Sequence, residues 1–178
     1  VIEGKWTFVA GETDRIEIVT RSDAVPYAYD GRTGQGIQFS VGLDDEVRIE
    51  LFNYPGSEPV TIASGYLAIE AGDTVTFSVR DDGEHVGITV MSDGGTGESL
   101  TLTGRSEVDF PRDYIVFHNR DNKYTTNLGY LDDVTAYVTG SLEIQVSPLR
   151  AFENVGSVDA VLTVSRASND DLAAPLIV

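Results

Sequence analysis

The chain has 178 residues, with 29 acidic residues against 12 lysines and arginines, a formal net charge of −17 and no cysteine. This charge excludes a nucleic-acid-binding surface, which needs a positive field, and it disfavours anionic membrane surfaces. The lack of cysteine excludes disulfides and cysteine-type zinc sites, and no apolar run approaches the roughly 20 residues needed for membrane insertion.

Apolar and polar residues alternate with a period of two along most of the chain, which is typical of half-buried β-strands. Turn sequences such as Asp30-Gly31 and Asp82-Gly83 separate these runs. We therefore predict an all-β fold, an antiparallel two-sheet sandwich with one solvated face on each sheet and Trp6 in the core. In chain order the alternating runs lie at residues 6–8, 37–41, 47–51, 75–79, 86–90, 100–102, 134–138, 142–146 and 158–164.

A domain boundary is predicted near Gly140-Ser141. Residues 1–140 carry enough strand-like runs for a self-sufficient sandwich, whereas residues 141–178 carry only about three strands, too few to close a core alone.

The run Tyr130-Leu131-Asp132-Asp133-Val134-Thr135, late in the first segment, resembles the closing strand of concanavalin A-like or laminin-G-like jelly-roll modules. The resemblance covers residues 1–140 and implies a carbohydrate-binding or adhesive module with a structural calcium ion. In those families an aspartate of this run helps to hold the ion, which implies Asp132 and Asp133 as ligands. An acid near the first strand would complete the site, with Glu3, Glu12 and Asp14 as the open choices.

The second segment resembles the opening of a Calx-beta domain, an immunoglobulin-like fold that binds calcium. The resemblance rests on residues 142–148, 152–157 and 161–166, and it implies Glu153 as a calcium ligand. The later strands and clustered aspartates that complete the calcium site of that family do not follow in this chain.

Asp132 and Asp133 are notable independently of the family resemblance, because they interrupt a strand pattern. Strict alternation would turn one of them toward the apolar face, where an unpaired carboxylate is costly. We predict a metal or a buried hydrogen-bond role for this pair. Other acidic clusters, at residues 44–46, 81–82, 93 and 121, are expected to be solvated turns, although Asp-rich loops suit calcium.

The sequence predicts no catalysis. Glycosidases use paired carboxylates, whereas Glu17 and Glu50 each stand alone on their strands. His85 and His118 are the only histidines, and no Gly-x-Ser-x-Gly elbow accompanies them. His118 follows Phe117 in an apolar run and is expected to be a satisfied core or edge residue.

Sugar binding is a separate hypothesis, because aromatic side chains stack on sugars while polar neighbours bond the hydroxyls. Tyr27, Tyr29, Tyr54 and Tyr124 lie in loop-like sequence and are the candidates, although tyrosine is also common on sandwich surfaces.

These observations favour a non-catalytic adhesion or structural module of a secreted or cell-surface protein, stabilised by calcium. Its partner would be an extracellular glycan or a neighbouring subunit. If unfinished sheet edges are completed by a neighbour, the chain would form a homo-oligomer or fibre by strand addition. The alternative is a carbohydrate-binding module of a polysaccharide-active multidomain protein.

Overall fold

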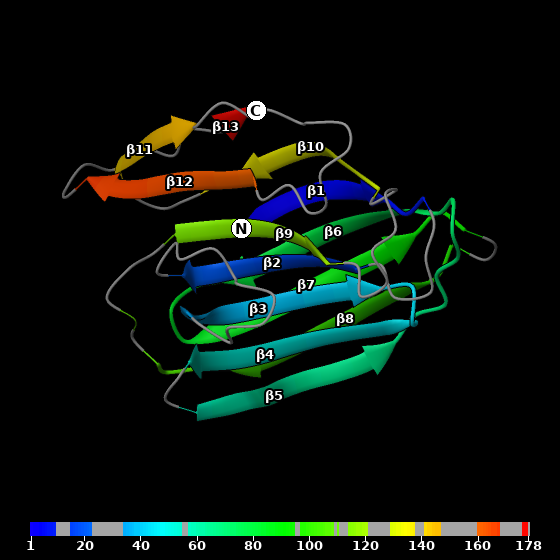
Figure 1. The fold of residues 1–178 in the computed structure, drawn as a ribbon, viewed down its shortest axis with the longest axis horizontal. Coiled ribbons are helices and arrows are strands. Elements are labelled where there is room, and N and C mark those ends of the chain that lie inside the picture. The colour runs from blue at the N-terminus through cyan, green and yellow to red at the C-terminus, as the bar shows by residue number, and fades with distance from the viewer. Residues whose placement is uncertain are drawn as a thin grey trace.

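Strands account for all the regular structure that the computed structural model describes, which contains no helix. The strands form two antiparallel sheets, which confirms the predicted all-β two-sheet class. Figure 1 shows the two layers, with β2–β5 of one sheet in front of β6–β8 of the other. The described residues are 1–9, 15–22, 34–54, 57–94, 97–108, 110, 114–120, 129–137, 141–146, 160–167 and 176–177.

Sheet A has the strand order β13-β10-β1-β6-β7-β8. Its strands are β1 (Ile2–Thr7), β6 (Thr74–Asp81), β7 (His85–Ser92), β8 (Ser99–Arg105), β10 (Tyr130–Ala136) and β13 (Leu176–Ile177).

Sheet B has the order β11-β12-β9-β2-β3-β4-β5. Its strands are β2 (Arg15–Ser22), β3 (Gly34–Gly42), β4 (Glu46–Tyr54), β5 (Ser57–Tyr66), β9 (Tyr114–Arg120), β11 (Ser141–Val146) and β12 (Ala160–Ala167).

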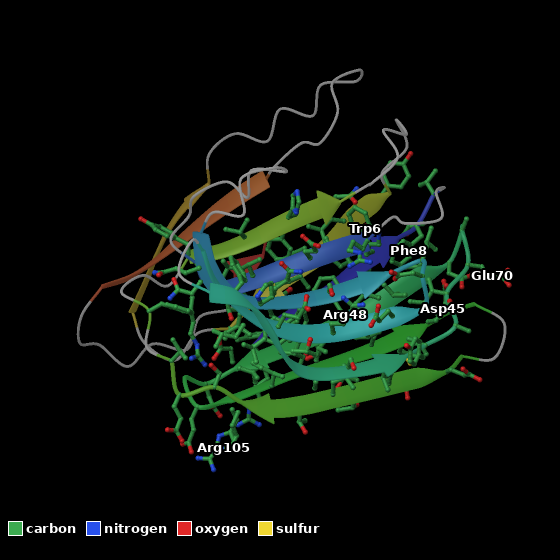
Figure 2. The ribbon with its side chains drawn as sticks, turned by 60° about the horizontal axis from the view of Figure 1, so that its bottom comes forward. Trp6, Phe8, Asp45, Arg48, Glu70 and Arg105 are labelled. Carbon is green, nitrogen blue, oxygen red and sulfur yellow. The ribbon has the colours of Figure 1, made fainter. Side chains whose placement is uncertain are left out.

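The inward side chains of the two sheets form one continuous core, as the period-two alternation predicts. Trp6 and Phe8 are both buried, and their rings meet edge to face with centroids 6.2 Å apart (Figure 2). Phe77 of β6 packs over Gly4 of β1, where a Cβ atom would lie only 2.6 Å from the ring. The glycine thus makes room for a large aromatic ring in the core.

The segment after residue 140 adds strands to one edge of this sandwich. β12 pairs with β9 through Ala160 and Phe117, and β13 pairs with β10 through Ile177 and Thr135. Strands β1–β10 supply five strands to each sheet, and the later strands extend both sheets on the same side. The predicted division at residue 140 stays a prediction.

Candidate functional site

The Asp132-Asp133 pair lies at an irregularity between β10 and β1. Glu3 faces Thr135 and Lys5 faces Asp132, so the register shifts between them, and Asp133 has a left-handed φ of 51°. Such a bulge lets two successive side chains share one face of a strand. Both aspartates are exposed, so the expectation that one of them points into the apolar core is wrong.

Asp133 has a cationic partner within the chain. The Lys5 ammonium donates to the Asp133 carboxylate, and this hydrogen bond raises the pKa of Lys5 above its usual value. Glu3, two residues along β1, is exposed and accepts from Ser78 Oγ at 3.4 Å. Within the described residues, no three acidic or histidine side chains gather as a metal-binding group. Glu153 lies outside the described residues, and the calcium prediction stays untested.

The outer side of sheet A carries rows of hydroxyl groups. We call it the hydroxyl face, and it consists of Thr74, Thr76, Ser78, Thr89, Ser99, Thr101 and Thr103, all exposed or half-buried. Strand register sets Ser78, Thr89 and Thr101 side by side on β6, β7 and β8. The hydroxyls of Thr89 and Thr101 lie 3.0 Å apart. The face therefore offers donors and acceptors over three adjacent strands.

An exposed aromatic side chain borders this face. Tyr130 begins β10, is 68% exposed and lies opposite Thr7 of β1. Thr7 in turn lies opposite Thr74, with their hydroxyls 2.9 Å apart. Tyr130, Thr7 and Thr74 therefore form one row across three strands.

The tyrosines that the sequence singled out are not placed by the structure. Tyr27, Tyr29 and Tyr124 lie outside the described residues, and Tyr54 ends β4 with its side chain not described. Tyr130 belongs to the run that carries the jelly-roll resemblance, but sequence reasoning treated that run as a metal site. Its position two residues before the outward-facing Asp132 is the signal that could have found it.

A buried polar pair lies on the outer side of sheet B. Glu17 of β2 and His118 of β9 face each other, with Glu17 Oε2 2.8 Å from His118 Nδ1. Both side chains are buried, although they point away from the main core. In the sequence Glu17 and His118 look isolated, because 101 positions separate them and only strand pairing brings them together.

The strand order does not place Ser40, a buried serine among the described residues, beside the imidazole of this pair. Ser40 is also buried and faces Glu17, but from β3, on the side opposite β9. Two strand spacings separate the strands of Ser40 and His118, about 10 Å, with Glu17 between them. A serine nucleophile needs the imidazole within hydrogen-bond reach, which this order of strands does not favour.

No protein-family model matches the chain, and neither a curated protein nor a solved structure shows detectable similarity to it. Within the described part of the chain, no helix is both long and apolar enough to span a membrane.

Proposed function

We propose that the chain is a non-catalytic adhesion module of a secreted or cell-surface protein, and that it binds a glycan on the outer side of sheet A. The main observation that supports this proposal is the exposed ring of Tyr130, which lies in one row with the hydroxyls of Thr7 and Thr74. An aromatic ring can cover the apolar side of a sugar, while hydroxyl groups bond its polar edge. The hydroxyl face extends this surface across β6, β7 and β8 for further sugar units.

The charge of the chain favours a neutral glycan as the ligand. A net charge of −17 repels acidic polysaccharides, and Lys5, on the same strand as Thr7, is already paired with Asp133. Neutral sugars need only hydrogen bonds and stacking, which threonine, serine and tyrosine provide.

We propose the jelly-roll module for residues 1–140 and the Calx-beta-like segment for 141–178 as the finer description of the fold. Five strands per sheet from the first segment support the former, as does the location of the Asp132-Asp133 run in β10, its last strand. A carbohydrate-binding module attached to an enzyme would use the same surface. Binding restricted to one polysaccharide, with none to cell-surface glycans, would favour that alternative.

Replacing Tyr130 with alanine is expected to weaken glycan binding about tenfold, because a central aromatic contact contributes more than about 1 kcal/mol. The measurement is a glycan-array screen of the wild type, followed by titration calorimetry with the best ligand. Tyr66→Ala is the matched control, since Tyr66 is 78% exposed but lies on β5 of the other sheet. Equal loss in both variants, or no binding to any neutral glycan, would contradict the proposal.

Calcium is proposed as a stabilising ion at Asp132 and Asp133. Chelation is expected to lower the melting temperature, because an ion that binds only the folded chain contributes about 2.7 kcal/mol at a hundredfold excess over its Kd. The double substitution Asp132→Asn with Asp133→Asn should remove this effect, and Glu107→Gln, another exposed acid, should keep it. A melting temperature unchanged by chelator would contradict the proposal that calcium stabilises the chain.

A further inference from the structure

β8 is the outer strand of sheet A on the side away from the C-terminal strands, and among the described strands it pairs with β7 alone. Two hydrogen bonds fix which residues of β8 bond to β7. Ser92 N donates to Glu98 O at 3.1 Å, and Ser106 N donates to Glu84 O at 2.9 Å. The direction of backbone hydrogen bonding alternates from residue to residue along a strand. Between Glu98 and Ser106, the N–H and C=O groups of Leu100, Leu102 and Gly104 therefore point toward β7.

The other residues of β8 direct their backbone groups away from the sheet. These are Ser99, Thr101, Thr103 and Arg105, and no described residue pairs with that side of the strand. An outer strand with a free row of donors and acceptors is a template for another strand.

Apolar side chains border the same edge. Leu100 and Leu102 are only half-buried against Gly65 of β5, which is the outer strand of sheet B. Val60 of β5 pairs with Leu51, a residue packed on the core, yet it is 56% exposed. The open side of the sandwich thus combines unpaired backbone with apolar surface that a partner would cover.

We propose that a second copy of this chain docks here by antiparallel pairing of the two β8 strands about Leu102. In this register Thr101 faces Thr103 of the second copy, and Ser99 faces its Arg105. All four outward-directed residues then form hydrogen-bonded pairs, whereas a shift in either direction leaves an end of the strand unpaired. The two Leu102 side chains meet on the inner side.

The charges at the ends of β8 favour the antiparallel arrangement. Exposed Glu98 precedes the strand, and Arg105, which ends it, projects from the body of the molecule (Figure 2). Antiparallel pairing about Leu102 sets Glu98 of one copy opposite Ser106 of the other, whereas parallel pairing in register would bring the two Glu98 residues together. Because each chain carries −17, association strengthens as salt screens the overall repulsion.

This pairing deepens the proposed adhesion role by naming the neighbouring subunit and the edge that it uses. The two-fold axis stands perpendicular to sheet A, so both hydroxyl faces and both Tyr130 side chains lie on the same side of the dimer. Two sites on one side raise the avidity for a glycan-covered surface. Self-association is measured without glycan, so its failure is distinguishable from a failure of glycan binding.

The test compares two double variants by sedimentation across micromolar to millimolar concentrations in moderate salt. The wild type is expected to approach twice the chain mass of 19.2 kDa. Thr101→Lys with Thr103→Lys places like charges in both central cross-strand pairs and should weaken the dimer about tenfold or more. Thr101→Lys with Thr103→Glu places opposite charges in the same pairs and should keep it.

Two features make the comparison decisive. The two-lysine variant lowers the net negative charge, which by overall repulsion alone would strengthen association, so weakening must come from the local pairs. Melting curves check that both variants fold. A wild type that stays monomeric throughout would overturn the proposal, as would a two-lysine variant that dimerises as well as the lysine–glutamate variant.

Discussion

Replacing Arg21 with methionine is expected to lower the free energy of unfolding by about 3–5 kcal/mol, the cost of breaking a buried ion pair by removing one partner. Arg21 of β2 bonds both carboxylate oxygens of Asp81 on β6, at 2.5–3.1 Å. The two side chains are only 8% and 10% exposed. This pair therefore links the two sheets, and its loss leaves a buried carboxylate without its cation.

The guanidinium also satisfies backbone groups near the end of β8. It donates from Nη1 to the carbonyl oxygens of Ser106 at 3.1 Å and Val108 at 2.7 Å. Thermal or urea unfolding measures the loss, which corresponds to a melting temperature lower by roughly 6–20 °C in a chain of this size. Arg105→Met, at an exposed ion pair, is the control and should change stability by less than about 1 kcal/mol.

A double variant distinguishes the contribution of the ion pair from the cost of leaving one buried charge without its partner. Arg21→Met with Asp81→Leu removes both charges and should recover much of the loss, because apolar replacements of buried pairs are often close to neutral. A single Arg21→Met variant as stable as the wild type would show that the inter-sheet pair contributes nothing.

Truncating Phe77 to alanine is expected to cost about 3–5 kcal/mol, because a fully buried ring is lost and a cavity remains. The ring packs on Gly4, which has no side chain that could move into the space. Chemical denaturation of the variant and the wild type gives the difference in free energy.

Met91→Ala is the control for this substitution. Met91 lies on the neighbouring strand β7 but on the outer side of sheet A, where its side chain is half exposed. Its truncation should change stability by within about 0.5 kcal/mol. A loss below 1 kcal/mol for Phe77→Ala would mean that the core at Gly4 is not packed as described.

The candidate site could be predicted from the sequence only in part. Alternation correctly assigns Trp6 to the core, but it fails at Asp132 and Asp133, where a bulge breaks the period of two. Arg21 is a second such position: its φ is 52° and the β2–β9 register shifts there. A bulge depends on the partner strand as well as on local sequence, so alternation cannot locate it.

The all-β class follows from the amino-acid sequence alone, as does the side that faces the core in regular strands such as β6 and β7, because both follow from the local alternation of side chains. Which strands are neighbours became known only from the three-dimensional structure. It joined Glu17 to His118, Arg21 to Asp81 and Tyr130 to the row of Thr7 and Thr74. Strand order and register are set by pairing between residues far apart in the chain, and no local pattern encodes those partners.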